Sequence, residues 1–228
     1  MNGDQPRWDS FFLFFAVLFG ALVRLAPVIL AGGPVNDGGM FYVMIGELKA
    51  NRFLLPAFTS YNHLSIPFAY PPLSLYAGAL LSAAGIPTLE VVRWLPALVS
   101  TASIPAFYWM ASRLLQSPGR AAVASVAYAL MPRLFSWYVM GGGLSRSFGM
   151  LFLLLTCGAA WAVFTRPGIR NLLLATLFGV GAVLSHPEMA VHTATACVLI
   201  WFWYGRSLRS ARDALLVAVG VGLLSSPW

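Results

Sequence analysis

The sequence predicts an all-α protein: a polytopic bundle of about seven membrane-spanning helices, with interfacial or re-entrant helices in its first outer loop. Two observations carry this prediction. The 228 residues are 59% hydrophobic and only 9% charged, and the mean hydropathy is +0.78, which is far too apolar for a soluble domain of this length. The apolar residues also form long runs separated by short polar connections, as in a multi-pass membrane protein.

The apolar runs that approach the roughly 20 residues needed to cross a bilayer are residues 11–31, 94–114, 121–140, 148–164, 172–185, 189–204 and 214–228. The first is longer than a signal peptide's apolar region and is interrupted by Arg24 and Pro27, so we expect a retained signal-anchor helix. We expect residues 1–228 to form a single transmembrane domain. The last run has no polar exit, which indicates the N-terminal part of a longer protein.

Arginines in the short connections predict the orientation. They occur in alternate connections, which should therefore face the cytoplasm: Arg113 and Arg120, then Arg166 and Arg170, then Arg206, Arg209 and Arg212. The apolar run 73–86 is of a length, about 14 residues, more typical of an interfacial or re-entrant segment than of a span. Residues 32–92 then form an outer loop, and the N-terminus of this cell-membrane protein is cytoplasmic. If 73–86 spans instead, the loop is cytoplasmic and the N-terminus is outside.

The outer loop contains Asp37 on a turn, Gly-Gly-Pro-Val-Asn-Asp-Gly-Gly, in a chain that otherwise avoids charge. Its carboxylate can act as a general base towards an acceptor hydroxyl, or as an oxygen ligand for a divalent cation. The alternative is an Asx turn or an N-cap for the helix expected at residues 40–50. That helix is amphipathic, with Phe41, Met44, Ile45 and Leu48 on one side, and should lie at the membrane interface.

A second polar turn, on the same outer face, contains His186, Pro187 and Glu188, and His192 follows Glu188 by one helical turn. His186 and Glu188 are candidate catalytic residues that could orient an acceptor hydroxyl. Together with Asp37 and His192 they are also the candidate ligands if a divalent metal ion is the cofactor. The alternative is a helix N-terminus at which the dipole favours Glu188, with His192 hydrogen-bonded within the bundle.

Four arginines lie away from the cytoplasmic connections: Arg24, Arg93, Arg133 and Arg146. Arginine within a membrane is costly and is a functional candidate by default, and guanidinium groups bind phosphate bidentately. These arginines predict a site for a lipid-linked phosphate in the outer leaflet; the alternative is snorkelling to lipid headgroups. The Gly141–Gly143 run lacks the lysine and spacing of a nucleotide loop and is expected to be a flexible turn. The sequence contains no basic helix of the kind that binds nucleic acid.

The order of these features resembles the GT-C fold, the superfamily of polytopic glycosyltransferases that includes protein mannosyltransferases and lipid A aminoarabinose transferase. The resemblance covers most of the chain. The similar features are Asn36-Asp37 in an early outer loop, Tyr-Pro-Pro-Leu at residues 70–73, Arg-Trp-Leu-Pro-Ala-Leu at 93–98, and the segments that end at Arg146 and Glu188. The last two are also similar to 6-pyruvoyl-tetrahydropterin-synthase-related membrane proteins.

The resemblance implies that Asp37 activates the acceptor while arginines hold a polyprenyl phosphate as the leaving group. The partners would be a polyprenyl-phosphate sugar donor, a glycan, lipid or protein acceptor, and membrane lipids, without nucleic acid. Gly38 follows Asp37, so the family's common Asp-Glu pair is absent and a mechanism with two carboxylates is in doubt. The soluble C-terminal domain of some members has no counterpart within residues 1–228.

The alternative functions are a transporter or flippase for lipid-linked glycans and a non-catalytic membrane scaffold. A transporter requires polar groups along a whole path, whereas the cytoplasmic halves of the predicted helices are almost purely apolar. A scaffold would leave the polar residues of the outer face without a common purpose. The two cysteines, Cys157 and Cys197, both fall in apolar runs and are expected to be small buried hydrophobes.

Overall fold

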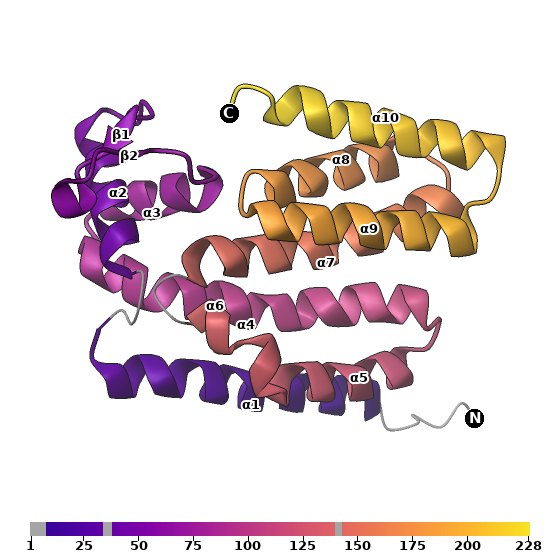
Figure 1. The fold of residues 1–228 in the computed structure, drawn as a ribbon. Coiled ribbons are helices and arrows are strands. Elements are labelled where there is room, and N and C mark those ends of the chain that lie inside the picture. The colour runs from indigo at the N-terminus through magenta and orange to yellow at the C-terminus, as the bar shows by residue number, and fades with distance from the viewer. Residues whose placement is uncertain (1–7, 34–37, 140–142) are drawn as a thin grey trace.

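The computed structural model describes residues 8–33, 38–139 and 143–228, and within them ten α-helices make an all-α protein, as the sequence predicts. The long helices lie side by side and alternate in direction along the chain (Figure 1). They are α1 (Trp8–Ala31), α4 (Thr88–Leu114), α5 (Pro118–Leu130), α7 (Gly143–Thr165), α8 (Ile169–Val183), α9 (Pro187–Tyr204) and α10 (Leu208–Ser225).

The shorter elements gather mainly at one end of this bundle (Figure 1). Between α1 and α4 lie α2 (Gly38–Ala50), β1 (Phe58–Thr59), the 3-10 helix η1 (Tyr61–His63), β2 (Ile66–Pro67) and α3 (Leu73–Ala83). The two strands pair antiparallel, with Phe58 opposite Pro67 and Thr59 opposite Ile66. Between α5 and α7 lie η2 (Pro132–Leu134) and α6 (Ser136–Val139).

Helix length and composition single out two candidate membrane spans in the described residues: α1, with a mean hydropathy of 2.4, and α7, with 1.9. Of the remaining predicted spans, α8 is apolar but shorter. Helix α3 has 11 residues, which at 1.5 Å per residue gives about 16 Å, roughly half of the hydrocarbon thickness of a bilayer. It is too short to cross, as expected for the run at 73–86.

The amphipathic face predicted for residues 40–50 is confirmed in α2. Phe41, Met44, Ile45 and Leu48 are all buried and pack against α3 and the first turns of α4 and α7. Gly78 of α3 makes this packing possible, because a β-carbon there would lie 2.6 Å from Ile45 Cδ1. The region between α1 and α4 is therefore attached to the bundle through an apolar core of its own.

The chain reverses between the long helices at well-defined caps. Ser117 caps α5, with Pro118 as the first helical residue, and Ser207 and Ser210 form a reciprocal capping box at the start of α10. Both connections lie at the end of the bundle away from α2 and α3 (Figure 1). We call this end the arginine end, because it contains seven arginines: Arg113, Arg120, Arg166, Arg170, Arg206, Arg209 and Arg212. The end formed by α2, α3 and the α8–α9 turn is the opposite end.

Candidate functional site

Three of the predicted site residues come together at the opposite end. Arg146, in the first turn of α7, donates a hydrogen bond from Nε to Nε2 of His186 across 3.3 Å. Its Nη2 lies 3.7 Å from Oε2 of Glu188. His186 and Glu188 flank Pro187 at the start of α9, 40 residues further along the chain. A guanidinium, an imidazole and a carboxylate are thus grouped at one point.

Close packing of α7 against α9 brings these groups within reach. Gly149, one turn after Arg146, lies so close to α9 that a β-carbon there would be 2.8 Å from Cβ of Met189 and 3.1 Å from Cβ of His186. Only a residue without a side chain allows this approach. The spacing between the two helices, and with it the Arg146–His186 contact, is set by a glycine.

The start of α3 is attached to the same point. The backbone N–H of Leu73 donates to the carbonyl of Leu184 across 2.9 Å, two residues before His186. The hydroxyls of Ser74 and Ser145 share a hydrogen bond of 3.3 Å, and both side chains are buried. Pro72 is the N-cap residue of this helix, and Pro71 before it is fully buried.

The hydrogen bond from Arg146 indicates which nitrogen of His186 holds the proton. Since Nε2 accepts, it has no proton, and the neutral ring is protonated on Nδ1. Burial lowers the pKa of His186, the adjacent charge of Arg146 lowers it further, and Glu188 opposes them. The net effect favours the neutral form of the ring. Its Nδ1 is buried and has no hydrogen-bond partner among the described residues, so it is an unsatisfied donor.

The ion pair between Arg146 and Glu188 leaves the arginine accessible. The side chains of these two residues are 37% and 51% exposed, and an exposed pair of this kind contributes at most about 1 kcal/mol. Arg146 also lies over the ring of Trp137 in α6, with 5.8 Å from Cζ to the ring centroid. Arg146 is thus held in position by three side chains but can still bind an anion.

Arg24 is fully buried in α1 and is bound by the protein itself. Its Nε donates to Ser100 Oγ (3.1 Å), and its Nη1 donates to the carbonyls of Gly20 (3.0 Å) and Ala129 (2.6 Å). Its guanidinium lies over the ring of Phe135, 4.5 Å from the centroid. Of the guanidinium nitrogens of Arg24, Nη2 is the one that is buried without a hydrogen-bond partner in the described part of the chain. The contacts indicate that Arg24 joins α1, α4 and α5.

The other two predicted phosphate-binding arginines differ from Arg146. Arg93 donates to the carbonyl of Val28 (3.3 Å), lies 3.7 Å from Glu90 and stacks on Trp94. It too is engaged within the protein. Arg133 is exposed in η2. Of the four arginines, only Arg146 contacts His186 and Glu188.

Asp37, the residue predicted to act as general base, lies outside the described residues, as do Asn36 and the glycines at 141 and 142. His192 is described: it is exposed on α9, one turn beyond Glu188. No group of three or more His, Cys, Asp or Glu side chains that could hold a metal ion occurs in the described ranges. His186, Glu188 and His192 therefore do not form a metal site by themselves, and any contribution of Asp37 remains a prediction.

The sequence did not predict Trp137, Ser74 and Ser145 as part of this site. Trp137 follows the predicted site residue Arg133 by four positions, but no local pattern assigns its ring to Arg146. Ser145 directly precedes Arg146, and Ser74 directly follows the Tyr-Pro-Pro-Leu element. Their adjacency to predicted residues was the one available signal.

Comparisons of the chain with protein-family models, with curated proteins and with solved structures found no match.

Proposed function

We propose that the chain is a multi-pass cell-membrane protein in which α1, α4, α7, α8, α9 and α10, together with the segment formed by α5, η2 and α6, cross the bilayer, with the arginine end in the cytoplasm. The distribution of charge supports this. Seven arginines and two acidic residues, Asp9 and Asp213, belong to the described part of the arginine end, the asymmetry expected of cytoplasmic connections. Reporter fusions in the α7–α8 connection and in the α8–α9 turn test the topology. Both reporting from the same side would contradict it.

Within this topology the chain is a glycosyltransferase of the GT-C type that uses a polyprenyl-phosphate sugar at the outer face. One observation carries the proposal: Arg146 is fixed by His186 and Glu188, yet 37% of its side chain is exposed. A fixed, exposed guanidinium at the membrane surface suits a phosphate. The resemblance to GT-C enzymes at the segments ending at Arg146 and Glu188 supplies the reaction class.

The transfer requires one bond to form and one to break. The acceptor's hydroxyl oxygen bonds to the anomeric carbon of the sugar, the bond from that carbon to the phosphate oxygen breaks, and polyprenyl phosphate leaves with the electron pair. Arg146 neutralises the negative charge that develops on this phosphate. Nδ1–H of His186 is a second donor for a phosphate oxygen. Asp37 takes the proton of the acceptor as the reaction proceeds.

Binding of polyprenyl phosphate to the purified protein tests the role of Arg146 without knowledge of the sugar. Arg146→Gln should weaken binding by roughly 10- to 150-fold, because a hydrogen bond to a charged group contributes about 1.5–3 kcal/mol. Arg146→Lys should lose less, since it keeps the charge. Arg170→Gln, at the arginine end, is the matched control. Equal affinity of Arg146→Gln and Arg170→Gln would refute the phosphate site.

Release of polyprenyl phosphate from a panel of lipid-linked sugars tests the reaction. Asp37→Asn should abolish release while leaving expression and binding of polyprenyl phosphate intact. Wild-type turnover by Asp37→Asn would refute the assignment of the base. Movement of the lipid-linked sugar across a vesicle membrane, without release of polyprenyl phosphate, would instead favour the transporter.

A further inference from the structure

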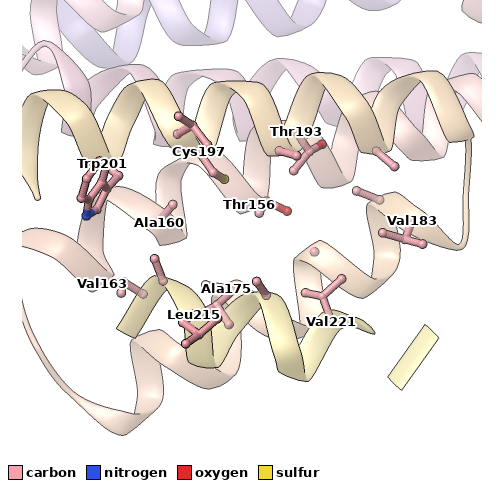
Figure 2. A pocket seen from close by; sticks show the side chains of 18 of the residues that line it. Thr156, Ala160, Val163, Ala175, Val183, Thr193, Cys197, Trp201, Leu215 and Val221 are labelled. Carbon is pink, nitrogen blue, oxygen red and sulfur yellow. The ribbon is translucent and has the colours of Figure 1, made fainter. Parts of the chain in front are cut away.

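An apolar cavity of about 540 Å³ lies between α7, α8, α9 and α10 (Figure 2). Hydrocarbon side chains and alanines make up most of its wall. The hydroxyls of Thr156 and Thr193, which also line it, both donate to carbonyls of their own helices across 2.6 Å. The wall therefore offers little to water or to a polar solute, and an apolar ligand would be favoured.

The volume fits one lipid chain. An apolar cavity of roughly 150 Å³ accepts a molecule of six carbons such as benzene. A cavity of 540 Å³ therefore has room for on the order of 20 carbon atoms by the same measure, the size of one acyl chain of a phospholipid. Ala194 of α9 and Ala218 of α10 line it and are themselves exposed. The cavity can thus be entered from the surface between these two helices.

One end of the cavity adjoins cationic side chains. Gly205 packs against Trp201 and Phe164, which both line the cavity, since a β-carbon there would lie 2.9 Å and 3.0 Å from their rings. Arg206 follows Gly205 directly, and Arg166 follows Phe164 by two residues. Both arginines are exposed and lie over aromatic rings of the helices that they follow, Arg206 over Phe202 of α9 and Arg166 over Trp161 of α7.

The acidic residue described near these arginines is Asp213, and it is already paired. Its carboxylate is buried and accepts hydrogen bonds from Arg212, with Arg209 3.7 Å away. Arg166 and Arg206 have no acidic partner among the described residues. Trp201, beside them, has a buried Nε1 that donates to no described group. A positive field and a free donor therefore lie at the same end of an apolar cavity.

We propose that this cavity is a binding site for one anionic phospholipid of the cytoplasmic leaflet. One acyl chain occupies the cavity, Arg206 and Arg166 bind the phosphate of the headgroup, and Nε1 of Trp201 donates to a phosphate or ester oxygen. The lipid completes the packing between α9 and α10. The proposal rests on the membrane topology proposed above but not on glycosyl transfer. It differs from the donor site, which lies at the opposite end of the bundle.

Lipid binding to protein purified in detergent tests this site, by native mass spectrometry and thermal shift. The probes are phosphatidylglycerol, phosphatidylcholine with identical acyl chains, and glycerol 3-phosphate. One phosphatidylglycerol molecule should remain bound and raise the melting temperature. Phosphatidylcholine should bind about tenfold or more weakly, since it lacks net charge, and glycerol 3-phosphate should have no effect. Equal binding of the two lipids would overturn the headgroup assignment.

Substitutions with matched controls locate the lipid. Ala194→Phe and Ala218→Phe place a ring in the mouth of the cavity and should each weaken phosphatidylglycerol binding about tenfold. The controls, Val191→Phe and Leu216→Phe, are on exposed faces of the same helices outside the cavity and should bind as wild type. If both test variants bind phosphatidylglycerol like their controls, the cavity is not the lipid-binding site. Circular dichroism verifies that all four variants fold.

The arginine variants test the headgroup contacts separately. Arg206→Gln should lower the preference for phosphatidylglycerol over phosphatidylcholine, whereas Arg120→Gln, in the α4–α5 connection of the same end, should not. Equal preferences in these two variants would contradict the role of Arg206. Lipid binding in a protein without transferase activity would refute the proposed enzyme and leave this site standing.

Discussion

Replacing Arg24 by methionine tests whether this buried guanidinium stabilises the bundle or serves a ligand. Methionine is unbranched and flexible, so it can fill much of the same space without a polar group. The change removes hydrogen bonds to Ser100 of α4 and to Ala129 of α5, residues that are 76 and 105 positions away in sequence. It therefore removes hydrogen bonds that join α1 to α4 and to α5.

The magnitude follows from the groups left unpaired. The carbonyl of Ala129 is in the last turn of α5 and lacks a helical partner, and Ser100 Oγ is buried. Each orphaned group costs about 1–3 kcal/mol. Part of that loss is offset because the buried charge no longer has to be desolvated, so we expect a net destabilisation of about 2–4 kcal/mol. For a chain of this length the melting temperature should fall by roughly 5 to 15 °C.

Thermal unfolding in detergent micelles measures the effect, with Arg93→Met as the control. Arg93 is 20% exposed, pairs with Glu90 in the preceding turn and donates one hydrogen bond to Val28, so its loss should cost less than that of Arg24, about 1–2 kcal/mol. An Arg24→Met protein that melts with the wild type would refute the structural role. If that variant melted normally but bound polyprenyl phosphate weakly, Arg24 would be a ligand for the donor.

Two further substitutions test the packing and the electrostatics of the opposite end. Gly149→Ala should destabilise the protein by about 1–3 kcal/mol through overpacking against Met189, and it should weaken polyprenyl phosphate binding because His186 can no longer lie beside Arg146. The control is Gly46→Ala, where an added β-carbon would meet nothing within 4 Å. Unchanged melting and binding in Gly149→Ala would contradict the packing argument. Burial raises the pKa of Glu47, but hydrogen bonds from Ser60, one of them 2.7 Å long, and from Thr59 outweigh this effect, so the pKa lies below 4.5. The stability that comes from this lowered pKa should be present above pH 4.5 and should be lost as the pH falls through the pKa of the folded state. Melting curves of wild type and Glu47→Gln should converge over this range, and a constant difference at every pH would contradict the assignment.

Local patterns were enough for several features of this molecule. The 3.6-residue periodicity of residues 40–50 predicted the buried face of α2, because a helix that packs on one side needs apolar residues on that side whatever its partner is. The short length of the apolar run at 73–86 predicted a helix too short to span. The arginines of alternate connections predicted that these connections share one end, since successive antiparallel helices return to the same end.

The site required the tertiary structure. Arg146, His186 and Glu188 were each predicted, but as members of larger sets: four arginines for the phosphate, and four ligands for a metal. Sequence spacing cannot distinguish Arg146 from Arg24, because both are arginines in apolar helices. Their different environments come from neighbours that are 40 to 105 residues away.

The sequence by itself therefore determined an apolar, helical chain with its arginines concentrated at one end, and a short list of polar residues at the other. Only the tertiary structure decided which of them meet. In the folded chain Arg146 contacts His186 and Glu188, Arg24 is enclosed between three helices, and a cavity lies between α9 and α10. The physical reason is that helix formation and burial of a face depend on nearby residues, whereas contacts across helices depend on how closely the backbones approach. At Gly149 and Gly20 that approach is set by the absence of a side chain.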